Sequence, residues 1–140
     1  MTKDKIKLRV RYQETDQMGV VYHANYFVWF EVGRAEFFRK LNMPYSEFEK
    51  NSLYLPVIKA YCEYKAPARY DDEITVITRM DELQEVRLTF HYHLFREREL
   101  LAKGTTEHAF VNQQGRPVVL RKQTPFLWRR LHETFNSSGG

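Results

Sequence analysis

Residues Glu14 to Tyr26, with the sequence ETDQMGVVYHANY, place a carboxylate and a glycine just before a long aromatic segment. Asp16 lies in the turn-like part of this stretch, and a helical pattern begins near Ala24. The first turn of a helix has unpaired backbone N–H groups and a partial positive charge, so it can polarise a carbonyl. A nearby carboxylate can attack that carbonyl or activate water against it. The stretch therefore indicates acyl-transfer chemistry at a helix N-terminus.

Each residue of this stretch also has a purely structural interpretation. An Asp in a turn commonly bonds nearby backbone or caps a helix, and for Asp16 alone this is the more frequent role. His23 acts either through its imidazole or only through its backbone N–H. Gly19 permits a positive φ or a close approach of substrate, or is an ordinary turn glycine. Asn25 and Tyr26 favour capping and packing over reaction.

Other catalytic devices are poorly supported. The chain has no G-x-S-x-G stretch, which argues against a nucleophile-elbow serine hydrolase. The single cysteine, Cys62, is in phase with apolar residues of a strand-like run, so we expect a buried, inert thiol. His91, His93 and His108 resemble a metal site only superficially, because an i, i+2 pair lacks a clear carboxylate or third ligand. We expect neither a metal nor a tightly bound cofactor.

The whole chain has 140 residues and 43% hydrophobic content, enough for one domain to fold without staples. We expect a single domain over residues 1–135 and a disordered tail over 136–140. The net charge of +4 is interspersed, which fits a small anionic ligand at least as well as nucleic acid, and we expect no nucleic-acid partner. Without a signal-peptide core, an apolar span or a second cysteine, the sequence predicts a cytoplasmic protein with no membrane span.

Hydrophobic periodicity predicts an α+β fold. A period of two indicates a half-buried first strand over 5–12, and a period near 3.6 indicates a long, mostly buried helix over 24–41. Ser46 and Glu49 have the spacing of a capping box for a short helix ending near Ser52. Consecutive strand-like runs without helices between them predict a largely antiparallel sheet, followed by a terminal helix; the runs are 54–64, 73–80, 85–96 and 100–111, and the helix is 124–135.

Arg34 falls on the most aromatic arc of the long helix, between Phe30 and Phe37. A guanidinium stays charged at this position, and an unpaired buried charge is costly. We therefore expect Arg34 to pair with Glu31 or with a carboxylate on a neighbouring element or subunit.

The order of Asp16, Gly19, the pair Tyr22 and His23, and the pair Asn25 and Tyr26 closely resembles the 4-hydroxybenzoyl-CoA thioesterase family, particularly its bacterial YbgC-like acyl-CoA thioesterases. The resemblance continues through Pro56, the run YKAPARYDD over 64–72 and the turn 115–117, so it covers nearly the whole chain.

The resemblance implies a hotdog fold, in which a five-stranded antiparallel sheet wraps a long central helix. It also implies dimers with active sites at the subunit interface, with further assembly to a homotetramer frequent. The implied reaction is hydrolysis of an acyl-CoA to a carboxylic acid and free coenzyme A, with coenzyme A as part of the substrate. The rivals are an acyl-carrier-protein thioesterase and a non-catalytic acyl-CoA-binding or scaffold protein of lipid metabolism.

The resemblance also implies residue roles. Asp16 is the nucleophile or the general base, and the backbone N–H of His23 polarises the carbonyl. Another branch of hotdog thioesterases carries its acid on the central helix, but Glu31 and Glu36 are better explained as ordinary helix charges with basic residues three or four positions on. The expected substrate-binding residues are Gly19, Val20, Tyr22, Asn25, Tyr26 and, for the coenzyme A phosphates, Arg87.

Overall fold

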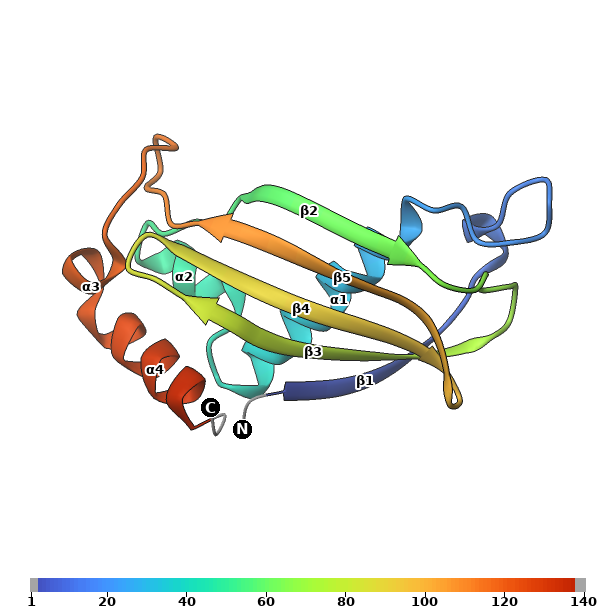
Figure 1. The fold of residues 1–140 in the computed structure, drawn as a ribbon. Coiled ribbons are helices and arrows are strands. Elements are labelled where there is room, and N and C mark those ends of the chain that lie inside the picture. The colour runs from blue at the N-terminus through green and yellow to red at the C-terminus, as the bar shows by residue number, and fades with distance from the viewer. Residues whose placement is uncertain (1–2, 138–140) are drawn as a thin grey trace.

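The computed structural model describes residues 3–137 as one antiparallel sheet with a long helix against one face (Figure 1). The strand order is β1-β3-β4-β5-β2, so β1 and β2 form the two edges. This confirms the predicted α+β class and the antiparallel pairing of the strands. The strands are β1 (Lys3–Arg9), β2 (Val57–Tyr64), β3 (Glu73–Leu83), β4 (Arg87–Arg96) and β5 (Glu99–Ala109).

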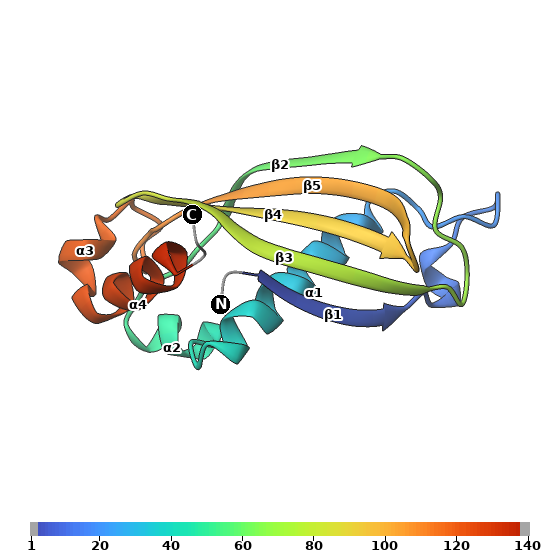
Figure 2. The ribbon, with the colours of Figure 1, turned by 60° about the horizontal axis from the view of Figure 1, so that its bottom comes forward.

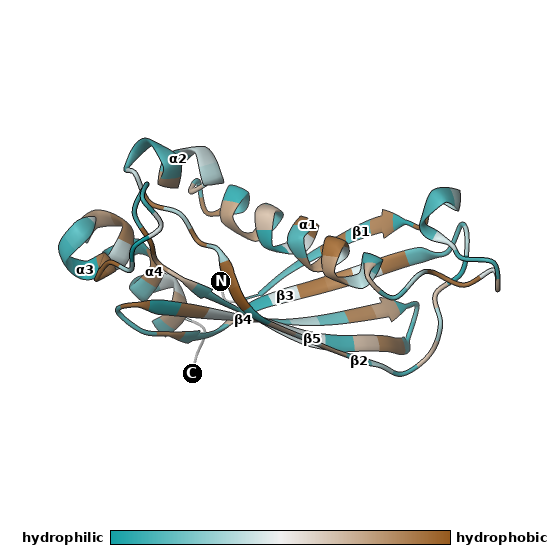
Figure 3. Cartoon of the chain, turned by 90° about the horizontal axis from the view of Figure 1, so that it is seen from above, coloured by the Kyte–Doolittle hydropathy of each residue, from teal (hydrophilic) through white to brown (hydrophobic). Residues whose placement is uncertain are grey.

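The long helix α1 (Asn25–Lys40) supplies much of the core. Its large side chains Trp29, Phe30, Phe37 and Phe38 are at most 2% exposed. Gly33 lets the helix backbone come close to β3, where an added Cβ would lie 2.5 Å from an oxygen of Thr78. The helix accordingly packs mainly against β3 and β1, and Figures 2 and 3 show it along one face of the curved sheet.

Several predicted element ends are wrong. β2 begins at Val57 rather than at 54, and β3 continues to Leu83 rather than ending at 80. Two further ends differ for local reasons. β1 ends at Arg9, and the chain then forms a short 3₁₀ turn, η1 (Tyr12–Glu14), where a strand was predicted to continue. The short helix α2 (Tyr45–Lys50) begins before Ser46, with the extended residue Pro44 at its N-cap and no side-chain cap bond. The predicted capping box of Ser46 and Glu49 is therefore absent.

The terminal helix is present with the predicted length, displaced by one residue toward the C-terminus, and a short helix that was not predicted precedes it. α3 (Leu120–Gln123) precedes α4 (Pro125–Asn136), and Pro125 begins α4 with the fixed φ that suits a first helical turn. Asn136 ends α4 and Ser137 caps it, so a tail starting at 136 is wrong at these two positions. Residues 138–140 lie outside the described part of the chain.

The two edges of the sheet differ in chemistry. β1 carries Lys5, Lys7 and Arg9 as exposed residues, and such charges protect an edge from pairing with other strands. β2 instead exposes a row of apolar and aromatic residues, Val57, Ile58, Tyr61 and Tyr64, which are 43–57% exposed. Because β2 is an edge strand, Cys62 is only partly buried, and the prediction of a buried thiol is wrong.

Candidate active site

Asp16 lies in a tight loop between the short pairing of Thr15 with Val21. Its backbone N–H donates to the Val20 carbonyl at 2.8 Å, and its Oδ1 accepts the Met18 N–H at 2.8 Å. Gly19 has φ +78°, so the loop needs the positive φ that glycine adopts without strain, and no heavy atom beyond its neighbours in the chain would lie within 4 Å of an added Cβ. One carboxylate oxygen therefore stabilises the loop, while Oδ2 has no partner among residues 3–137 and the residue is exposed.

Glu14 connects this loop to α1. Its buried carboxylate accepts the Trp29 indole N–H at 3.0 Å and the Arg11 backbone N–H at 2.7 Å. Its carbonyl accepts the backbone N–H of Tyr22 at 2.8 Å and the side-chain amide of Asn25 at 3.0 Å. Asn25 thus joins loop and helix rather than capping, and Glu14 is a functional candidate that the sequence reasoning missed. Its position two residues before Asp16 was the available signal.

The start of α1 presents unpaired backbone donors. Among the described residues, the N–H groups of His23 and Ala24 have no acceptor, whereas the Asn25 N–H donates to the Tyr22 carbonyl at 2.9 Å. No acidic residue occupies the first turn, so the positive end of the helix dipole is not neutralised locally. The two N–H groups therefore form a place where a developing oxyanion would be stabilised.

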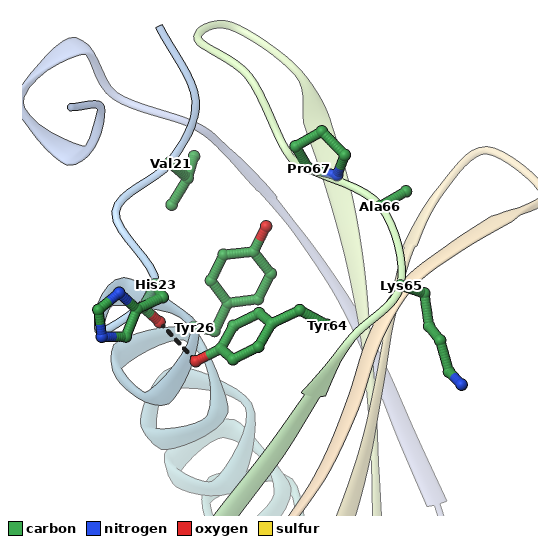
Figure 4. A pocket seen from close by; sticks show the side chains of 7 residues that line it. All are labelled: Val21, His23, Tyr26, Tyr64, Lys65, Ala66 and Pro67. Atoms are coloured by element: carbon green, nitrogen blue, oxygen red, sulfur yellow. Dashed lines mark hydrogen bonds between the residues drawn. The ribbon is translucent and has the colours of Figure 1, made fainter. Parts of the chain in front are cut away.

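Tyr64 fixes the orientation of this helix start from the end of β2. Its hydroxyl donates to the His23 carbonyl at 3.0 Å, as Figure 4 shows. Burial first, and then a hydrogen bond with Cys62, raises the pKa of Tyr64 to about 12, so the phenol remains a donor near neutral pH. Tyr64 is the second residue that the sequence reasoning missed, although it begins the run YKAPARYDD.

An open pocket of about 280 Å³ lies beside the helix start (Figure 4). His23, just before α1, and Tyr26, in its first turn, line it on one side, and Tyr64 and Lys65, at and just after the end of β2, line it on the other. The Tyr26 hydroxyl accepts the Ala68 N–H at 3.1 Å, and burial raises the pKa of Tyr26. The pocket therefore combines mostly apolar walls with one edge of backbone donors, which suits a thioester.

The other expected site residues are placed around the pocket rather than in it. Val20 pairs with Arg69, and the exposed ring of Tyr22 contacts the His23 ring in a tilted arrangement, with the ring centroids 4.5 Å apart. Neither Asp16 nor Val20 lines the pocket. Within one chain, Glu14 thus connects the loop of Asp16 to the unpaired N–H groups of His23 and Ala24, but Asp16 does not line the same pocket as His23.

Arg87 lies at the opposite end of the sheet. It pairs with Ala109 on β5, whereas Tyr64 pairs with Ala102, a separation of roughly 24 Å at about 3.4 Å per residue. Its guanidinium is 3.3 Å from the Glu107 carboxylate. One chain does not bring Arg87 to the pocket at His23.

His91, His93 and His108 do not lie together as a metal site would require. His108 is fully buried in the core, while His91 and His93 lie half-buried on the sheet face turned away from α1. Within residues 3–137, no group of three or more His, Cys, Asp or Glu side chains is arranged to hold a metal ion. The helices of this range include none with the length and apolar content needed to span a membrane.

A five-stranded antiparallel sheet curled around a central helix is the hotdog fold, and similar proteins with this fold are thioester hydrolases. The pattern of the Thioesterase-like superfamily matches residues 10–127, and the chain belongs to this family.

Relatives agree in sequence and in structure. YneP of Bacillus subtilis is 37% identical over 135 residues, which cover 95% of this chain and 97% of YneP. The acyl-CoA thioesterase YbgC of Haemophilus influenzae is 32% identical over 126 residues, 89% of this chain and 93% of its own. The crystal structure of a DHNA-CoA thioesterase from Staphylococcus aureus superposes with a TM-score of 0.92 at 30% identity, covering 100% of this chain and 97% of that one.

Proposed function

We propose that this protein hydrolyses an acyl-CoA thioester to a carboxylic acid and free coenzyme A. The observation that carries the proposal is the pair of unpaired amides, at His23 and Ala24, beside a pocket whose helix is joined through Glu14 to the Asp16 loop. The names of relatives support the substrate class, since YbgC of Haemophilus influenzae is named an acyl-CoA thioesterase. The chemistry needs no metal, because the protein supplies both the electrophilic and the basic group.

In the proposed mechanism, the thioester oxygen binds the backbone N–H of His23, with Ala24 as a second donor. These donors stabilise the negative charge that develops on the oxygen, which is worth about 3 kcal/mol for one donor of this kind. The free Oδ2 of Asp16 attacks the carbonyl carbon or removes a proton from the attacking water. The C–S bond then breaks, and coenzyme A leaves as the thiol after taking up a proton. If Asp16 is the nucleophile, its carboxylate is left as a mixed anhydride with the acyl group, and water cleaves this anhydride to release the carboxylic acid and restore Asp16.

We propose further that the site is completed by a second copy of the chain. Two β2 edges related by a twofold axis pair antiparallel, so the Val57 end of one strand meets the Tyr64 end of the other. Arg87 lies near the Val57 end and would approach the partner's pocket, where its charge can meet a coenzyme A phosphate. Exposed Val28 and Val32 on α1 supply further apolar surface for this homodimer or for a homotetramer built from it.

A thiol-release assay tests the reaction. The substrates are aryl, short-chain and long-chain acyl-CoA and the matching acylated carrier proteins, assayed without added metal. We expect turnover of at least one acyl-CoA class. Faster turnover of the carrier-protein substrates would favour the acyl-carrier-protein alternative, and binding of acyl-CoA without turnover would favour the non-catalytic one.

Asp16→Asn tests the acid. This nearly isosteric change should lower kcat at least about a hundredfold, because general-base and nucleophilic groups contribute at least that much. The matched control is Asp81→Asn, an exposed acid on β3 that pairs with Arg79. If Asp16→Asn keeps kcat within about threefold of the parent while Asp81→Asn behaves the same, the acid lies elsewhere, and Glu31 and Glu36 become the candidates.

A further inference from the structure

Arg34 is a buried cation without a counter-ion. The residue is 8% exposed, its Nε donates to the Tyr45 hydroxyl at 2.7 Å, and its Nη1 donates to the Tyr92 hydroxyl at 3.1 Å. Among residues 3–137 no carboxylate pairs with it, so the expected pairing with Glu31 is wrong within the chain. Two of the five N–H groups of the guanidinium are used, and the other three have no acceptor in this range.

The side chains in the hydrogen-bond network of Arg34 are neutral near pH 7. Tyr92 hydrogen-bonds Thr106 at 2.6 Å, Thr106 bonds Nε2 of His108 at 2.8 Å, and Nδ1 of His108 lies 3.0 Å from the Leu55 carbonyl. A carbonyl only accepts, so Nδ1 carries the proton and each earlier hydroxyl donates onward, which leaves Tyr92 to accept from Arg34.

The pKa shifts of these groups agree with this direction of hydrogen bonding. Burial raises the pKa of Tyr45 and of Tyr92, so neither phenol is an anion near neutral pH. Burial, together with the charge of Arg34, lowers the pKa of His108 to about 4, so the imidazole is neutral as well. The network therefore holds one positive charge that forms no ion pair among residues 3–137, although the Glu49 carboxylate lines the same pocket and Glu31 acts electrostatically on Tyr45. Leaving such a charge buried without a partner is costly.

A pocket of about 130 Å³ opens onto the guanidinium. Phe48, Leu53 and Leu55 form its apolar walls, and the exposed residue Glu49 lies at its rim. The pocket is separate from the one at the helix start, because the two share no lining residue, and Asn25 and Arg34 lie nine residues apart along α1, about 14 Å. A cationic floor under apolar walls suits a carboxylate that carries a small hydrocarbon group.

We propose that the Arg34 pocket binds the carboxylate of an organic acid, with the guanidinium fork as its partner. A planar guanidinium matches a carboxylate with two parallel N–H···O bonds, and three N–H groups are available for them. The carboxylate belongs either to a free acid or to the far end of a long acyl group whose thioester occupies the pocket at His23. The second source rests on the proposed thioesterase activity, whereas the first does not.

Calorimetric titration of the full chain with benzoate and with uncharged benzamide tests the site. We expect benzoate to bind at least about tenfold more tightly, since the two ligands differ in the charge that meets Arg34. Arg34→Lys keeps the charge but loses the fork and should weaken benzoate binding at least about fivefold. Equal affinity of the two ligands would overturn the proposal.

A second variant avoids the risk that a change at the buried Arg34 disturbs folding. Glu49→Gln removes a like charge from the rim and should tighten benzoate binding about threefold, an effect that added salt reduces. The matched control is Glu47→Gln, on the same helix but paired with Lys50 rather than facing the pocket. Benzoate affinity that is unchanged in Glu49→Gln would place benzoate elsewhere, such as the pocket at His23, and would refute the site.

Turnover distinguishes the two sources of the carboxylate. If it is the distal group of a substrate, Glu49→Gln should raise kcat/KM for a long dicarboxylic acyl-CoA and leave the matching monocarboxylic acyl-CoA unchanged. If it is a free acid, neither kcat/KM changes while the benzoate result stands. Absence of all turnover would contradict the proposed function only, because the titration with benzoate does not depend on catalysis.

Discussion

Changing Glu14 to Gln should lower turnover more than it lowers stability, because Glu14 positions the Asp16 loop. The carboxylate accepts from the Trp29 indole and from the Arg11 backbone N–H, at 3.0 and 2.7 Å, and it is only 4% exposed as a residue. Gln has one oxygen, so its amide N–H₂ must face one of these donors. Losing one hydrogen bond to a charged acceptor costs about 2 kcal/mol.

That cost leaves the protein folded. A domain of this size is typically stable by about 5–15 kcal/mol, and about 2 kcal/mol corresponds to a fall in Tm of about 6 °C. The catalytic effect should be larger than the stability effect, because the Glu14 carbonyl also holds the Tyr22 N–H and the Asn25 side chain. A displacement of the loop on the order of 1 Å can lower the rate about a hundredfold. We therefore expect kcat to fall roughly 10- to 100-fold with KM changed less than about threefold.

The assay is steady-state thiol release at 25 °C alongside thermal melts of the same samples. Trp29→Phe removes the same hydrogen bond from the other side, so the double mutant with Glu14→Gln should be about 1 kcal/mol more stable than the sum of the single changes predicts. A Glu14→Gln enzyme with a lowered Tm but a kcat within twofold of the parent would refute the positioning role and leave Glu14 as a folding residue only.

Three further predictions address the helix start, the interface and the buried histidine. His23→Ala keeps the backbone N–H and should retain most of kcat. His23→Pro removes this N–H and should lose about 3 kcal/mol of transition-state stabilisation, with a thermal melt as the folding control. A folded but inactive His23→Ala enzyme would show that the imidazole is catalytic. Tyr61→Lys puts a charge on the exposed β2 edge, so sedimentation should show monomers and turnover should fall, and an active monomer would contradict a shared site. The pKa of His108 falls from 6.5 to about 4 on folding, so the unfolded chain binds more protons than the folded chain between these pH values. The contribution of His108 to the free energy of unfolding, at most roughly 3 kcal/mol, is therefore present above pH 6.5 and is lost as the pH falls through 4. His108→Gln should reduce the pH dependence of the free energy of unfolding, measured by chemical denaturation, over that window.

The sequence predicted well those features that depend on neighbours along the chain. The long helix and the order of strands follow from periodicity, because burial imposes a period of 3.6 on α1 and of 2 on β4. The φ of +78° at Gly19 was one of the alternatives that residue type alone allowed. Predictions failed where a contact distant in sequence decided the outcome. Cys62 is half-buried because β2 ends the sheet, and the strand order is not encoded in the local pattern of β2.

The placement of Arg34 shows the same limit at the level of chemistry. Its position on an aromatic arc predicted a buried charge, and the expectation of a partner was physically sound. The partners turned out to be Tyr45 and Tyr92, which are 11 and 58 residues away along the chain. Neutral hydroxyls satisfy hydrogen bonds but leave the charge itself uncompensated, and for that reason Arg34 became a binding candidate rather than a structural ion pair.

If Arg87 binds a coenzyme A phosphate, as proposed, its separation from the pocket at His23 requires a site shared between chains. Arg87 pairs with one end of β5 and Tyr64 pairs seven residues away along the same strand, so the two lie at opposite ends of the sheet. A twofold axis through β2 exchanges these ends, and β2 is the edge with the apolar surface needed for burial, whereas β1 is blocked by charges. Pairing about this axis would also place the partner strand beside Tyr64, whose hydroxyl orients the His23 carbonyl. On this reasoning, pairing of the chains and assembly of the active site are a single event.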